Sequence, residues 1–203
     1  MTSRRGMTLM ELVVGLTVAG LALAMGAAAL TGATDQRARA EAAVSATARI
    51  AAERRQLAAW VAGAKLTPDG DGPPFRGLDG TDGDLPDDEL TFLTGARVSG
   101  ERGPTVIRLL VDRDSATPEQ GLTAELRQLG PGRRVARIEI EPAAASLDLR
   151  YSTRMLGRTE WLPSWISSTV LPSAVEISLG ARPGDTLPGL LRLPVLIPLG
   201  NVR

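Results

Sequence analysis

The 203-residue sequence predicts an α+β protein in which a long N-terminal helix precedes an antiparallel β domain. Two observations predict this class. Residues 12–66 form apolar and alanine-rich runs without strand-like alternation. From Glu89 onward, short runs rich in Val, Ile and Leu alternate with period two and are separated by Gly, Pro and Asp. This length allows one membrane segment and one ordinary domain.

Composition excludes several kinds of chemistry. The 23 basic and 23 acidic residues balance, and no basic stripe is interleaved with aromatic residues, so we predict no nucleic-acid partner. Without cysteine or histidine, disulfides, Cys–His or Ser–His–Asp catalysis and the commonest zinc ligands are excluded. An enzyme would need a carboxylate pair or a dyad built on Lys65, and neither lies in a preorganised motif. We predict no catalytic residue, metal, cofactor or small-molecule substrate.

The first element is an apolar segment. Residues 12–30 contain no charged residue and one hydroxyl-bearing residue, Thr17. A helix that crosses the hydrocarbon core of a bilayer requires about 20 predominantly apolar residues. Arg4 and Arg5 precede the segment, and no basic cluster directly follows it. The positive-inside rule therefore predicts a single-pass protein with a cytoplasmic N-terminus and the bulk of the chain across the membrane.

Three interpretations of this segment compete. A cleaved signal peptide would use residues 22–24 or 27–29 as its A-x-A site, but residues 34–66 continue as helix, which is unusual directly after such a site. A plain membrane anchor leaves Glu11 unexplained. A carboxylate costs about 2.5–3.5 kcal/mol at the centre of a span and less near its end, so Glu11 is tolerable as a lone solvated group. The third interpretation gives it a partner.

That partner is an amino group. A cut between Gly6 and Met7 would give Met7 a free ammonium and make Glu11 the fifth residue of the mature chain. Each charge would then need neutralising in lipid. A buried opposite-charge pair adds little stability but strongly penalises wrong registers, which suits a device for stacking helices.

These residues resemble a known motif. The sequence RRGMTLMELVVGLTVAGLAL, residues 4–23, is similar to the cleavage and assembly motif of type IV pilins and type II secretion pseudopilins, with Met7 where phenylalanine is usual. The resemblance implies that a prepilin peptidase cuts after Gly6 and N-methylates Met7. It also implies that Glu11 pairs with the N-terminal amine of a neighbouring subunit in a filament.

The next segments are a helix and a loop. Residues 34–66 predict an amphipathic helix continuous with the span, whose apolar stripe packs on the domain core. The stripe comprises Ala43, Ala46, Ile50, Leu57, Val61 and Ala64. Residues 67–88 are rich in Gly, Pro and Asp and predict a loop. Its aspartates are compatible with solvated turns or with a calcium site. The EF-hand pattern is not met, because Pro86 follows Asp82 and Asp84 at the position of the third ligand.

The remaining residues, 89–203, predict the β domain. The expected strands lie within residues 89–94, 105–114, 121–129, 134–141, 146–152, 174–179 and 190–198. Alternation in residues 146–152 places Leu147, Leu149 and Tyr151 on one face. Pro194 and Pro198 remove donors, so the last run predicts an edge strand.

A second resemblance lies in this domain. The sequence SLDLRYSTRMLGRTEWLPSWISSTVLPSAVEISL, residues 146–179, is similar to the J subunit of the type II secretion pseudopilus, as is DELTFLTG, residues 88–95. The matches include Trp161 and Trp165, which we expect to pack in the core or a turn, with an interface role as the alternative.

The two resemblances together imply a pilin-like fold and a minor pseudopilin at the tip of the type II secretion pseudopilus, which helps to export folded proteins across the outer membrane. The implied partners are the I-, K- and H-like minor pseudopilins, the major pseudopilin and the prepilin peptidase. The implied location is the inner membrane, with a periplasmic C-terminal domain. The alternative is a minor pilin of a type IV pilus or of a competence pseudopilus. The implied organisation is a leader (1–6), a transmembrane assembly helix (7–33), an amphipathic helix (34–66), a loop (67–88) and a β-rich pseudopilin domain (89–203).

Overall fold

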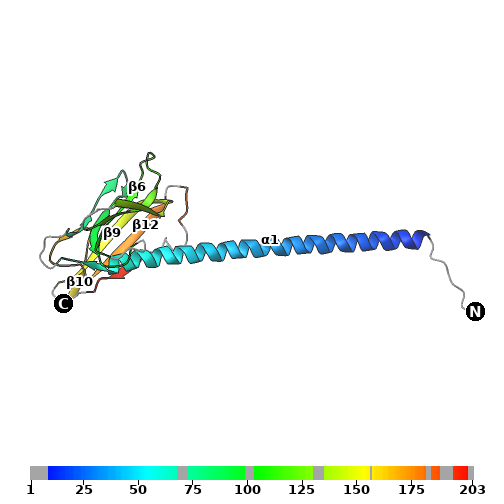
Figure 1. The fold of residues 1–203 in the computed structure, drawn as a ribbon, viewed down its shortest axis with the longest axis horizontal. Helices are drawn as coiled ribbons and strands as arrows, with labels where there is room; N and C mark the ends of the chain where they lie inside the picture. Colours follow the sequence, from blue (N-terminus) through cyan, green and yellow to red (C-terminus); the bar gives the residue numbers. More distant parts are fainter. Residues whose placement is uncertain are drawn as a thin grey trace, which may run out of the picture. The chain divides into compact units, whose positions relative to one another are not determined.

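The computed structural model describes residues 9–67, 73–98, 103–129, 135–155, 157–181, 184–187 and 194–200. One long helix is followed by antiparallel strands (Figure 1), which confirms the predicted α+β class. The elements are α1 (Leu9–Ala62), β1 (Ala64–Lys65), β2 (Phe75–Leu78), β3 (Thr81–Asp82), β4 (Leu85–Pro86), β5 (Glu89–Thr94), β6 (Thr105–Asp112), β7 (Gly121–Gln128), β8 (Val135–Glu141), β9 (Ala144–Met155), β10 (Arg158–Leu162), β11 (Trp165–Ser167), β12 (Ala174–Ala181) and β13 (Val195–Pro198).

The helix α1 is a single element of 54 residues, and the chain divides into two compact units at residues 48 and 49. No proline interrupts the helix, so its backbone hydrogen-bond ladder can run unbroken from the apolar segment into the alanine-rich segment. It ends at Ala62, and the N–H of Gly63 donates to the carbonyl of Ala59 at 3.0 Å. Strand β1 begins one residue later, so the helix is shorter than the predicted limit at residue 66.

The end of α1 supplies part of the core of the β domain. Leu57, Trp60 and Val61 are buried in the same cluster as strand residues, and the Thr94 hydroxyl donates to the Trp60 carbonyl at 2.8 Å. The predicted stripe is therefore right for its last turns. It is wrong at Ala43 and Ala46, which are exposed, because the helix lies in the second unit only from residue 49 onward.

Two sheets make up most of the β domain. The seven-stranded sheet has the order β11-β2-β5-β6-β7-β8, with β1 paired to β5, and the four-stranded sheet has the order β10-β9-β12-β13. All pairings within them are antiparallel, and β3 pairs with β4 in a separate two-stranded ribbon. Within the described residues β13 pairs only with β12, so the edge position predicted from Pro194 and Pro198 is confirmed.

The core lies where the two sheets face each other. Tyr151 of β9 packs edge-on against Phe75 of β2, with ring centroids 6.2 Å apart, and Phe75 in turn lies 6.1 Å from Phe92 of β5. Leu147, Leu149 and Tyr151 are fully buried, as the alternation of residues 146–152 predicts. Large apolar side chains from both sheets thus share one hydrophobic cluster with the end of α1.

One segment differs from its prediction. Residues 67–88 were expected to form a loop, but they contain β2, β3 and β4, and Phe75 is 1% exposed. The glycine inside β2 has a packing reason, because a Cβ at Gly77 would collide with the phenol ring of Tyr151. A strand of four residues that contains a glycine carries too little alternation to be recognised from sequence.

Candidate functional site

The N-terminal part of α1 exposes its apolar side chains. Leu9, Leu23 and Leu30 are 86%, 76% and 68% exposed, and the other large apolar residues of this part are also open. The Thr17 hydroxyl bonds the helix's own carbonyls, those of Val13 and Val14, at 3.0 and 2.9 Å. Among the described residues, α1 is the one helix that by length and composition could span a membrane.

Glu11 lies in the first turn of α1. A carboxylate at this end of a helix is favoured by the exposed N–H groups and by the helix dipole. Gly6 and Met7, the expected processing residues, lie outside the described residues. The structure therefore places the acidic member of the predicted charge pair at the start of the apolar helix and leaves the other predicted members untested.

Small residues share a face of the helix with Glu11. At about 100° per residue, the positions four, eleven, fifteen and eighteen residues further on fall within one stripe. These positions are Gly15, Ala22, Gly26 and Ala29. A Cβ added at Gly15 or Gly26 would meet no atom within 4 Å, so the fold of this chain does not require glycine there. Such small residues allow close approach between membrane helices.

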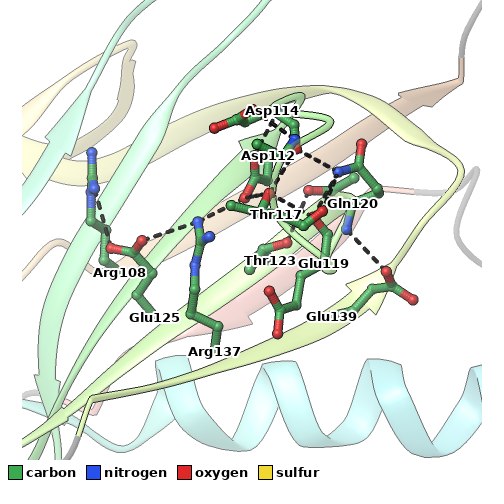
Figure 2. Close-up of polar contacts among 12 residues, drawn as sticks. Arg108, Asp112, Asp114, Thr117, Glu119, Gln120, Thr123, Glu125, Arg137 and Glu139 are labelled. Carbon is green, nitrogen blue, oxygen red and sulfur yellow. Dashed lines mark hydrogen bonds and ion pairs between the residues drawn. The ribbon is translucent and has the colours of Figure 1, made fainter.

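The second polar feature is an ion-pair network on the face of the seven-stranded sheet that points away from the core (Figure 2). Arg108 of β6 bonds Glu89 of β5 at 2.6 Å and Glu125 of β7 at 3.2 Å. Arg137 of β8 bonds Glu125 at 3.2 Å and Asp112 of β6 at 2.7 Å. The register pairs Arg108 with Glu125 and Glu125 with Arg137, so the charges alternate across neighbouring strands.

This network shifts the pKa values of its members. The hydrogen bond from Arg108 holds the pKa of Glu89 below its usual value. The pKa of Asp112 is lowered chiefly by the backbone N–H of Asp114, at 2.9 Å, with help from Thr117 and Arg137. Both carboxylates are therefore stabilised in their charged form. The network was not predicted, although opposite charges stand in the alternating runs of β6, β7 and β8.

Three aspartates of the predicted loop have structural partners. Asp82 and Asp87 both pair with Arg113, at 3.5 and 2.7 Å. Asp88 is 4% exposed and accepts hydrogen bonds from the N–H groups of Gly80 and Leu149, at 3.0 and 2.6 Å. Across the described ranges, no group of three or more acidic side chains is arranged to hold a metal ion.

The two tryptophans of the second resemblance occupy different surroundings. Trp161 is 42% exposed on β10, so the expectation of core packing is wrong for this residue. Trp165 is half-buried against the core, and its indole N–H donates to the carbonyl of Val170 at 3.2 Å. Trp60, which was not singled out, fills the core instead and is 2% exposed. Trp161 lies on the outward face because it pairs with Ser152, whose neighbour Tyr151 points inward.

Comparisons with protein-family models, with curated proteins and with solved structures each find no match to this chain.

Proposed function

We propose that this chain is a minor pseudopilin of a type II secretion system, similar to the J subunit, with a pilin-like fold and a place at the tip of the pseudopilus. The observation that supports this most is Glu11 at the start of an apolar helix whose side chains are open. The motif of residues 4–23 assigns Gly6 and Met7 to prepilin cleavage and N-methylation. The inner membrane would hold the helix, with the β domain in the periplasm.

The same helix serves two states in this proposal. Before assembly, its apolar side chains face lipid and anchor the subunit by a single span. During assembly, helices of neighbouring subunits bundle, and the amine of Met7 and the carboxylate of Glu11 neutralise each other between subunits. Because an unpaired charge in lipid is costly, wrong registers of the helices are disfavoured. The open glycines on the stripe with Glu11 allow the helices to approach closely.

The substitution Glu11→Ala tests the assembly step. We expect it to leave membrane insertion intact, because it makes the segment more apolar, and to reduce incorporation into sheared filaments by about tenfold or more, which corresponds to about 1.4 kcal/mol. Glu41→Ala is the matched control: Glu41 lies on the same helix, and its ion pair with Arg37 is exposed and worth little. Equal incorporation of both variants would contradict the pairing role.

The mass of the intact, membrane-extracted protein tests the processing step. We expect the loss of residues 1–6 and the addition of one methyl group. A new N-terminus beyond residue 24 would instead identify an ordinary exported protein and refute the proposal. Genes for type II secretion pseudopilins beside this one would support the J-like role, whereas adjacent pilus or competence genes would move the chain to the alternative machine.

A further inference from the structure

Strand β10 forms an open edge of the four-stranded sheet. Among the described residues it pairs only with β9, and all its residues are exposed. The segment from β10 to the turn after β11 also contains much of the exposed apolar surface of the β domain, with Trp161 at 42%, Ile166 at 64% and Val170 at 56%. Open strand edges present unpaired N–H and C=O groups to other chains.

The other edges of the two sheets are protected. Strand β13 ends at Pro198 and is directly preceded by Pro194, and prolines lack N–H donors. Strand β8 carries Arg137, Glu139 and Glu141, and charged residues discourage edge pairing. Strand β11 has only three residues. Strand β10 has five residues and no proline of its own, and beside its two charged residues, Arg158 and Glu160, it presents Trp161.

The backbone direction of β10 follows from its neighbours. The Ser152 carbonyl accepts a hydrogen bond from the N–H of Ser173, on the β12 side of β9. In antiparallel sheets the N–H and C=O of one residue point to the same side, so Ser152 directs no backbone group toward β10. Its partner Trp161, and likewise Thr159 opposite Arg154, therefore direct their N–H and C=O groups to the open edge.

A polar hollow lies next to this edge. Its volume is about 300 Å³, and it is lined by Ser152, Thr153, Arg154, Thr159 and Ser173. Within the part of the chain that the structure describes, no hydrogen bond or ion pair engages the side chains of these five residues. Thr159 belongs to both features, and Arg154 and Thr159 are cross-strand partners. A guanidinium with no acidic partner among hydroxyls complements a carboxylate.

We propose that the open edge of β10 binds an extended segment of a neighbouring subunit, which adds a strand beside Thr159 and Trp161 and places an acidic side chain in the hollow at Arg154. Backbone hydrogen bonds to the edge provide affinity, and the hollow and the indole provide selectivity. Only the identity of the occupant as a sister subunit rests on the proposed function. The docking edge lies on the β domain and does not use Glu11.

Photo-crosslinking of the full-length chain in its own membrane tests this inference. With p-benzoylphenylalanine in place of Trp161, we expect a covalent adduct with a sister subunit. The same crosslinker at Leu196, which is 59% exposed on the opposite edge strand of the same sheet, gives the background. An adduct with a second copy of this chain, with a protein outside the assembly, or at background level would overturn the proposal.

Two pairs of variants show whether the adduct forms by strand addition. Thr159→Pro removes the outward N–H without removing a bond to β9, whereas Thr159→Val keeps that N–H. We expect about fivefold less adduct for Thr159→Pro and for Arg154→Glu, and little change for Thr159→Val and Arg154→Lys. Thermal unfolding confirms that each variant is folded. Equal adduct in all four variants would exclude strand addition.

The two proposals can fail separately. If Glu11→Ala blocks incorporation and no adduct forms at β10, the docking edge is wrong and the proposed function stands. If the intact mass shows no prepilin cleavage, the proposed function fails whatever happens at β10, and a sister-subunit occupant is refuted with it.

Discussion

The glycines of α1 and those within the strands of the β domain have opposite surroundings. Gly15 and Gly26 of α1 have open space where a side chain would begin. A Cβ at Gly77 of β2 would collide with Tyr151, and one at Gly180 of β12 would collide with the Ser146 hydroxyl. The glycines within the described strands therefore complete the packing of the β domain. In the helix, no contact among the described residues accounts for them, so contacts with other molecules are the remaining explanation.

The same contrast holds for apolar and charged side chains. The β domain buries its large apolar residues between two sheets and pairs its charges across strands, as Arg108 and Glu125 illustrate. The N-terminal part of α1 leaves its leucines open. The β domain thus buries most of its large apolar side chains by its own contacts, whereas the N-terminal part of α1 exposes an apolar surface of the kind that membranes or other helices can cover.

The largest expected effect comes from exchanging glycine for alanine in both regions. Gly77→Ala should lower the free energy of unfolding by about 3 kcal/mol, because the new methyl group collides with the buried Tyr151 ring. Gly26→Ala should cause no loss, because its site is open and alanine favours helix. Thermal unfolding of the full chain in detergent, followed by tryptophan fluorescence, measures both. A similar loss in the two variants would remove the contrast.

The next effect compares two arginines of the same network. Arg137→Met should cost about 2 kcal/mol, because it leaves Asp112, whose side chain is 6% exposed, without its guanidinium partner. Arg108→Met should cost less than about 1 kcal/mol, because Arg108 is 44% exposed and water can replace it. Denaturant unfolding of the two variants gives the difference. A larger loss of stability for Arg108→Met would show that burial does not determine which ion pair contributes more.

The pH dependence of stability should separate two buried aspartates. Because the pKa of Asp112 is lowered in the folded chain, its contribution is complete above its unfolded-state pKa, about 3.9, and is lost as the pH falls through the folded-state value. Burial raises the pKa of Asp88, so its contribution is complete below its unfolded-state pKa and is lost as the pH rises through the folded-state value.

The matching variants make this measurable. Asp112→Asn should flatten the loss of stability on the acid side, and Asp88→Asn should reduce the loss that follows as the pH rises. Unfolding midpoints recorded in steps of pH through the acidic range give both slopes. Identical slopes in the two variants would mean that neither aspartate produces the expected pH dependence.

The smallest effect is expected at the Tyr151 hydroxyl, which is buried and has no hydrogen-bond partner in the described part of the chain. Tyr151→Phe should change the free energy of unfolding by less than about 1 kcal/mol, and in the stabilising direction, because it removes a polar group that burial penalises. Chemical denaturation detects this change. Strong destabilisation would indicate that the hydroxyl is bonded.

Sequence alone predicted those elements whose pattern is long and uninterrupted. The alternation of residues 146–152 predicted the buried face of β9, and the prolines near β13 predicted an edge. Strand β2 was not predicted, because its packing depends on the fit between Gly77 and a tyrosine 74 positions away in the chain. The outward orientation of Trp161 was not predicted, because it follows from the register of β10 with β9, and the sequence of a short strand does not reveal its register.

The candidate site was predictable only where one segment contains it. Glu11 stands out because it is an acidic residue next to an uncharged run. The ion-pair network joins residues from four strands, and sequence does not show which strands are neighbours. The edge of β10 is recognisable only when the order of strands in both sheets is known.

The link between β10 and β11 has a mechanical consequence. β10 ends at Leu162 in one sheet, and β11 begins at Trp165 in the other, so only Pro163 and Ser164 join them. Two residues span at most about 7 Å when extended, and the proline ring fixes one torsion, so the connection has little slack. A pulling force on β10 would therefore be transmitted directly to β11, so both sheets would have to resist it.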